Sequence, residues 1–112
     1  MQILTLGLNQ EQAEQLSCHK DYNFYHSQSM ADACHRMEHE DFNLILKQTN
    51  LGSTENNTIS TLLGLTPIST KILLFGKQVD SSCLCAWREL GIDFIPDPTV
   101  PELIQQIQTN EP

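Results

Sequence analysis

A polar residue ends one of the most apolar segments of the chain. Within residues 42–52, FNLILKQTNLG, three consecutive apolar residues lead to Lys47 and Gln48, and a polar turn follows. In α/β proteins, ligands and reacting groups lie at the carboxyl ends of the strands. An amide such as Gln48 cannot serve as a carboxylate nucleophile. The residue type therefore argues against covalent carboxylate chemistry at this position.

Histidine spacing raises a second chemical possibility. His35 and His39 are four residues apart in a predicted helix, which places them on one face, with Cys34 and Glu38 nearby. Zinc takes three or four such ligands in fixed geometry. An exposed polar stripe over residues 35–40 is the simpler interpretation, and we expect no metal. His19 and His26 lie at the ends of predicted elements and are expected at the surface.

The cysteines do not form a recognisable pattern. Cys83 and Cys85 are two residues apart, so a helix would point them to different sides, and there is no CxxC motif. Free cysteine often behaves as a small core residue. We expect reduced, buried thiols in a cytoplasmic protein.

Composition limits the partners. The 112 residues carry a net charge of −8 with only six Lys plus Arg, so nucleic-acid binding by this domain alone is not expected. With 39% hydrophobic and 18% charged residues it reads as one globular domain. No apolar run suggests a membrane span and no signal peptide is recognisable, so we expect a cytoplasmic location. Acidic residues around the second predicted helix form a solvated face or, alternatively, a docking surface for a basic partner: Asp21, Asp32, Glu38, Glu40 and Asp41.

Predicted strands and helices alternate along the chain. Strands are expected near residues 3–8, 22–26, 43–48, 71–76 and 92–95, and helices near 10–17, 30–39, 59–65, 81–90 and 100–108. The third and fourth strands are continuous apolar runs, which is typical of parallel strands buried on both faces. The pattern predicts a three-layer α/β fold with right-handed crossovers. Predicted caps are Asn9, Ser29, Asp80 or Ser81, Gly91 and Thr99.

Two segments resemble a known family. Residues 91–103, GIDFIPDPTVPEL, and residues 43–52, NLILKQTNLG, are similar to segments of the receiver domain of bacterial response regulators, the CheY-like family. The resemblance covers nearly all of residues 1–109. It implies a flavodoxin-like (βα)5 fold with strand order 2-1-3-4-5. Residues 110–112 are then a frayed tail or the start of a linker.

The resemblance fails at the positions that carry receiver chemistry. The acidic pair that holds magnesium falls on Gly7 and Leu8, and the phosphoacceptor falls on Gln48. The hydroxyl residue closing the fourth strand falls on Gly76, and the phosphate-contacting Lys falls on Asp97. Magnesium prefers carboxylate oxygens, which Gly7 and Leu8 do not offer. The resemblance also implies a cis peptide bond between Asp97 and Pro98.

These losses predict a pseudo-receiver, a domain that is not an enzyme, uses no cofactor and acts by binding protein. The resemblance implies a setting in bacterial signal transduction or transcriptional regulation, as the N-terminal regulatory or dimerisation module of a larger regulator. In receivers, the face made by the fourth helix, fifth strand and fifth helix carries protein contacts. The matching residues here are Leu84, Trp87, Arg88, Phe94 and Ile104. Trp87 fits a core position as well as an interface.

Two alternatives remain. A small-ligand or nucleotide sensor could use the space left over Gly7, Gln48 and Gly76. A phosphotransfer domain with a cysteine nucleophile would need a Cys at the end of the first strand. Gly7 and Leu8 occupy that place, and Cys18 falls late in the first helix, which disfavours this alternative.

Overall fold

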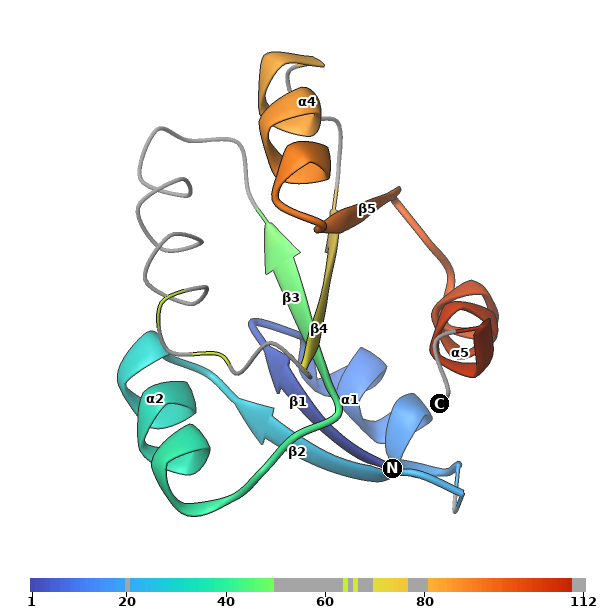
Figure 1. The fold of residues 1–112 in the computed structure, drawn as a ribbon. Helices are drawn as coiled ribbons and strands as arrows, with labels where there is room; N and C mark the ends of the chain where they lie inside the picture. Colours follow the sequence, from blue (N-terminus) through green and yellow to red (C-terminus); the bar gives the residue numbers. More distant parts are fainter. Residues whose placement is uncertain (20, 50–63, 65, 67–69, 77–80, 110–112) are drawn as a thin grey trace.

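A computed structural model describes residues 1–19, 21–49, 64, 66, 70–76 and 81–109, without the side chains of residues 49 and 81–84 (Figure 1). Strands and helices alternate over the described residues as predicted, except between the third and fourth strands, where most of the expected helix lies outside them. The strands are β1 (Gln2–Leu6), β2 (Asn23–Ser27), β3 (Leu44–Thr49), β4 (Lys71–Gly76) and β5 (Asp93–Pro96). The helices are α1 (Gln10–Ser17), α2 (Met30–His39), α4 (Ser81–Glu89) and α5 (Val100–Thr109).

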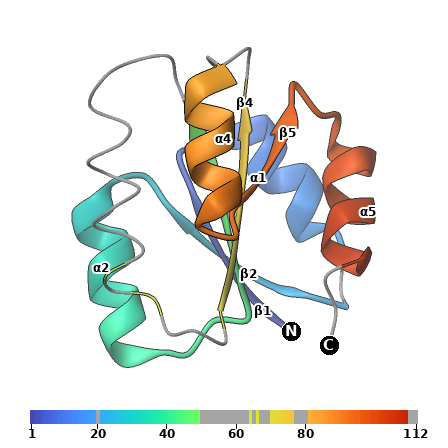
Figure 2. The same ribbon diagram turned by 45° about the horizontal axis from the view of Figure 1, so that its top comes forward.

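The five strands form one parallel sheet in the order β2-β1-β3-β4-β5. This confirms the predicted fold class and strand order. Parallel neighbours need crossover connections, so each described helix packs on a face of the sheet. Helices α1 and α5 cover one face, and α2 and α4 cover the other (Figure 2).

Each face of the sheet has its own hydrophobic core. The α1/α5 core includes Ile3, Leu8, Leu16, Leu44, Leu46, Leu73, Phe75, Leu103 and Ile107. The α2/α4 core includes Leu4, Leu6, Ala33, Phe42, Ile45, Ile72, Leu74, Trp87 and Ile92. Because successive side chains of a strand point to opposite faces, the continuous apolar runs of β3 and β4 supply both cores.

Helix ends follow the predicted signals. The Asn9 side chain accepts a hydrogen bond from the Gln12 N–H at 2.8 Å, and the Gln12 side-chain oxygen accepts one from the Asn9 N–H, which is a capping box. Ser29 caps α2 through the Asp32 N–H. Gly91 has φ +78, and two backbone bonds, Gly91 N–H to Arg88 and Ile92 N–H to Trp87, close α4 in a Schellman motif.

Some predictions fall outside the described residues. They are most of the expected helix at residues 59–65, the preceding polar loop, the cap at Asp80 and the tail at residues 110–112. In the described part of the chain, no helix has the length and apolar character to cross a membrane.

Candidate functional site

The carboxyl edge of the sheet brings together four of the five positions expected to form the pocket. A Cβ atom on Gly7 would lie 3.8 Å from both the Cβ and the backbone oxygen of Gln48. Gly76 pairs with Thr49 of β3 and Pro96 of β5. The Asp97 N–H donates a hydrogen bond to the Gly76 oxygen. These four residues therefore lie together at the carboxyl edge of the sheet.

The fifth position, Leu8, belongs to the core. Its side chain is 2% exposed and lies in the α1/α5 core, away from the edge. Gly7 makes the turn before it with φ +82, a conformation that suits glycine, while its N–H donates to the Ser27 oxygen at 3.1 Å. Neither position supplies a side-chain oxygen to the edge. The pair cannot hold magnesium as an acidic pair does.

Lys47 is a residue of this edge whose burial was not anticipated. It is 4% exposed, and its Nζ donates to the Gln48 oxygen at 3.2 Å. Its register places it between Leu6 and Leu74, on the side of the sheet facing the α2/α4 core. The signal was available in the sequence, because a residue two after buried Ile45 in a strand shares its face.

The turn after β5 corrects one expectation. No cis peptide bond is present among the described residues, so the Asp97–Pro98 bond is trans. Asp97 instead takes the left-handed conformation, with φ +40, which Asp tolerates better than most residues. The turn is closed by the bond from the Asp97 N–H to Gly76, and the trans isomer is the favoured one for an X–Pro bond.

The expected interaction face is only partly exposed. Trp87 and Ile104 are 4% and 7% exposed, so both belong to the core. For Trp87 the sequence fits a core position as well as an interface, and for Ile104 the burial is contrary to the expected interaction face. Trp87 packs against Phe94 with ring centroids 5.8 Å apart. The physical reason is that helices α4 and α5 turn their apolar sides toward the sheet. Leu84 lies in α4, but its side chain is outside the described part.

An open groove of about 460 Å³ lies along β5 on this face. Arg88 and the half-buried Phe94 line it, and Leu90, at 57% exposure, lies at the end of α4 nearby. Leu90 was not predicted to be part of the interaction face, because its position at the end of the helix did not indicate that its side chain is exposed. Residues from α4, β5 and α5 line the groove, namely Arg88, Ile92, Asp93, Phe94, Ile95, Pro96 and Gln106.

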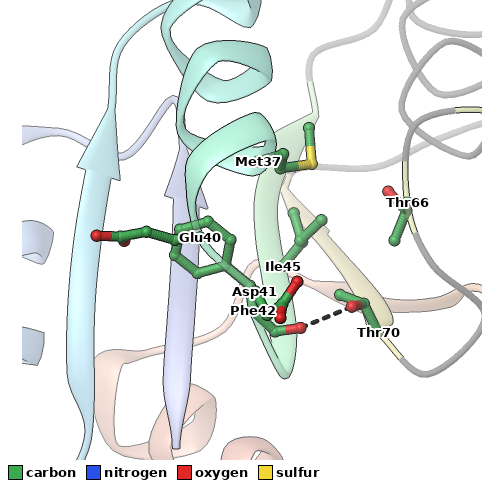
Figure 3. A pocket seen from close by; sticks show the side chains of 7 residues that line it. All are labelled: Met37, Glu40, Asp41, Phe42, Ile45, Thr66 and Thr70. Atoms are coloured by element: carbon green, nitrogen blue, oxygen red, sulfur yellow. Dashed lines mark hydrogen bonds between the residues drawn. The ribbon is translucent and has the colours of Figure 1, made fainter.

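A second hollow lies between α2, β3 and the segment before β4 (Figure 3). Met37, Phe42 and Ile45 form its apolar side, and the Thr70 hydroxyl donates to the Phe42 oxygen at 2.6 Å. Its volume is about 20 Å³, which suits a single water molecule. This hollow is too small for a metabolite.

His26 connects three elements, which corrects its expected place at the surface. Its Nδ1 is 2.6 Å from the Thr5 hydroxyl oxygen and its Nε2 is 2.9 Å from that of Ser17. Burial, and secondly the positive charge of Arg36, lower the pKa of His26. A neutral hydroxyl at Thr5 cannot stabilise an imidazolium as a carboxylate does in a catalytic triad. The network joins α1, β1 and β2.

The thiols also differ from expectation. Cys18 and Cys85 are exposed and Cys34 is half-buried, so the described cysteines do not fill the core. Cys18 lies at the end of α1, where its Sγ donates to the Glu14 oxygen at 3.4 Å. Larger aliphatic side chains occupy both cores instead.

Comparison with known proteins shows the fold. No protein-family model and no curated protein sequence matches the chain. The CpaE2 pilus assembly protein of Sinorhizobium meliloti 1021 is similar in structure, with a TM-score of 0.75 and 14% identity, covering 99% of this chain and 100% of that one. The pilus assembly protein CpaE of Caulobacter crescentus CB15 has a TM-score of 0.71 and 14% identity, covering 97% and 89%.

Two further structures are similar. A pilus assembly-related protein of Burkholderia pseudomallei K96243 has a TM-score of 0.72 and 19% identity, covering 98% of this chain and 88% of that one. A de novo designed Rossmann 2x3 fold protein has a TM-score of 0.65 and 16% identity, covering 96% and 86%. Together these likenesses establish a receiver-like α/β fold of the Rossmann and flavodoxin type.

Proposed function

We propose that this domain is a pseudo-receiver, which has the receiver-like fold but works by binding protein and not by accepting a phosphoryl group. The observation that carries the proposal is the placement of Gly7 and Leu8. The first has no side chain, and the second points into the α1/α5 core. An aspartyl-phosphate also needs a carboxylate nucleophile, and Gln48 supplies an amide.

The groove along β5 is the surface we propose for the interaction. It offers an aromatic ring, Phe94, next to a guanidinium, Arg88, and aromatic residues and Arg are enriched at protein interfaces. Exposed Leu90 adds apolar area that is buried when a partner docks. Strand β5 is the edge of the sheet, but Pro96 and the charge of Asp93 oppose pairing with another strand. Contacts through side chains are therefore favoured.

We propose that the partner is a second copy of the chain. The groove carries Arg88 and Asp93 on one surface, so a two-fold axis would set the Arg88 of each copy against the Asp93 of the other. Asp93 has a neighbour in its own chain, the Lys71 ammonium at 3.5 Å, and both side chains of that pair are largely exposed. Exposed ion pairs of this kind are weak, so Asp93 can exchange Lys71 for the Arg88 of a second copy.

Light scattering after size-exclusion chromatography tests this proposal. We expect the mass of the full chain to rise from monomer to dimer with concentration. Arg88→Glu combined with Leu90→Glu should weaken dimerisation at least tenfold. His19→Glu, at an exposed position beyond α1, is the matched control and should dimerise like the natural sequence. A monomer at every concentration, or equal dimerisation by the double variant, would overturn the proposed face.

The neighbours in structure suggest a cellular setting. Three of them are called pilus assembly or pilus assembly-related proteins, and they come from bacteria. We propose that the domain works in pilus assembly in the cytoplasm of a bacterium, and we favour this role over transcriptional regulation. Interaction of the domain with components of a pilus assembly system, and loss of pili when its gene is deleted, would support this setting.

A small-ligand sensor is the second candidate. It is favoured by the two glycines, Gly7 and Gly76, that leave the edge near Gln48 without bulky side chains, and by the buried cation of Lys47 beside it. A thermal-shift screen against nucleotides and cyclic nucleotides tests it. A rise in melting temperature that Gln48→Ala abolishes would favour the sensor over a role in protein binding alone.

A further inference from the structure

Helix α2 presents three potential metal ligands on its exposed side. They are His35, Glu38 and His39, and their nearest ligand atoms all lie within 4.8 Å of one another. The two imidazole rings are 4.7 Å apart between centroids, at 69°. Among the described residues, no hydrogen bond or ion pair engages these three side chains. Their donor atoms are therefore available to an ion.

The spacing comes from helix geometry. Residues three and four apart lie on the same face, so Glu38 and His39 both lie on the side of the helix that carries His35. A tetrahedral ion with bonds of about 2.0–2.1 Å needs donors about 3.3 Å apart. Exposed His and Glu side chains reach that separation by rotating about their χ angles. The backbone already has the required arrangement.

The local charge favours a cation. His39 is the last residue of α2, and carbonyl groups at a helix C-terminus carry partial negative charge. Glu40 and Asp41 follow directly and are exposed. The helix also carries Arg36, but its Nε is bonded to Asp32 at 3.1 Å and its guanidinium lies over the Tyr25 ring, 6.0 Å from the centroid. The Arg36 guanidinium thus contacts Asp32 and Tyr25, which are outside the cluster of His35, Glu38 and His39.

We propose that His35, Glu38 and His39 bind a divalent first-row transition-metal ion, with zinc as the cellular candidate. Two imidazoles and one carboxylate match the donor preference of zinc, and magnesium prefers an all-oxygen shell. Three protein ligands leave a coordination position for water or for a group on another molecule. The site is on the opposite side of the sheet from α5 and does not depend on the proposed dimer face.

Calorimetric titration of the full chain with zinc chloride tests the site. We expect saturable binding, lowered at least tenfold by His35→Ala or by His39→Ala and less strongly by Glu38→Gln. His19→Ala is the matched control, an exposed histidine outside the cluster, and should bind zinc like the natural sequence. Magnesium chloride should give no saturable binding at the same concentrations.

Two results would overturn the proposal. One is the absence of saturable zinc binding to the natural sequence. The other is unchanged affinity in the His35→Ala/His39→Ala double variant, which would assign the ion to other groups, such as the exposed thiols of Cys18 and Cys85. Because all three substituted side chains are exposed, circular dichroism should show that each variant keeps the fold.

Discussion

Leu8 occupies the position that matches the second acid of a receiver's magnesium-binding pair, and it packs in the α1/α5 core. Its side chain supplies packing in that core and no oxygen at the edge of the sheet. Leu90, in contrast, has 57% of its surface exposed at the end of α4. The same residue type thus serves the core at one end of the molecule and a surface at the other.

Leu8→Ala should reduce the free energy of unfolding by about 2–5 kcal/mol, since it removes buried methyl groups and leaves a cavity. Leu90→Ala is the matched control, and its effect should stay within about 0.5 kcal/mol. Urea denaturation of both variants measures the difference. Similar losses in the two variants would contradict the placement of Leu8 in the core.

His26 should make stability depend on pH. Burial, followed by the charge of Arg36, lowers the pKa of His26 below its ordinary value of 6.5. Between the lowered pKa and 6.5 the unfolded chain binds more protons, so stability is complete above the ordinary value and falls as the pH drops below it. We expect the urea concentration at the midpoint of unfolding to decrease as the pH is lowered from about 7.5 to about 5.5.

A histidine variant tests this origin of the pH dependence. His26→Gln should show a smaller change in urea midpoint over the same pH range, because glutamine does not titrate. His19→Gln, at an exposed position, should keep the pH dependence of the natural sequence. If the urea midpoint of His26→Gln changed with pH as much as that of the natural sequence, the pH dependence would come from another group.

At the scale of elements, local signals were enough to place the secondary structure. The caps at Asn9 and Ser29 and the apolar runs of β3 and β4 predicted elements that the structure confirms within one or two residues. These signals work because capping and strand burial depend on neighbours in the sequence. Exposure was harder to predict. For Trp87 the sequence fitted a core position and an interface alike, and the packing of α4 on the sheet places it in the core.

Gly91 offers a test of the α4 end. Alanine at φ +78 is strained, so Gly91→Ala should reduce the free energy of unfolding by about 1–2 kcal/mol. Gly64 is the matched control, because a Cβ there meets nothing within 4 Å and its φ is not in the left-handed region. Gly64→Ala should be neutral or stabilising. Equal destabilisation in the two variants would contradict the Schellman motif.

At the scale of the whole molecule, the strand order and the gathering of Gly7, Gln48, Gly76 and Asp97 at one edge followed from the receiver resemblance. A parallel sheet always brings the carboxyl ends of its strands together, so this gathering needs only the correct topology. The trans bond after Asp97 did not follow from the resemblance. The burial of Lys47 was not anticipated either, although the alternation of side chains along β3 indicated it.

The net charge of −8 predicts the behaviour of the whole domain toward polyanions. Phosphate backbones attract clustered cations, and this chain has six Lys plus Arg against 14 Asp plus Glu. We expect no retardation of duplex DNA in a gel-shift assay at about 0.1 M salt. Saturable binding at that salt concentration would show a basic surface that the charge balance does not predict.

The most direct test of the central claim is intact-mass spectrometry after incubation with magnesium and acetyl phosphate, alongside a competent receiver as a positive control. We expect the control to gain a phosphoryl group and this chain to keep its mass, because Gly7, Leu8 and Gln48 supply no carboxylate at the edge of the sheet. A stoichiometric, base-labile adduct on this chain would contradict the pseudo-receiver proposal and would direct attention to another carboxylate, such as Asp97.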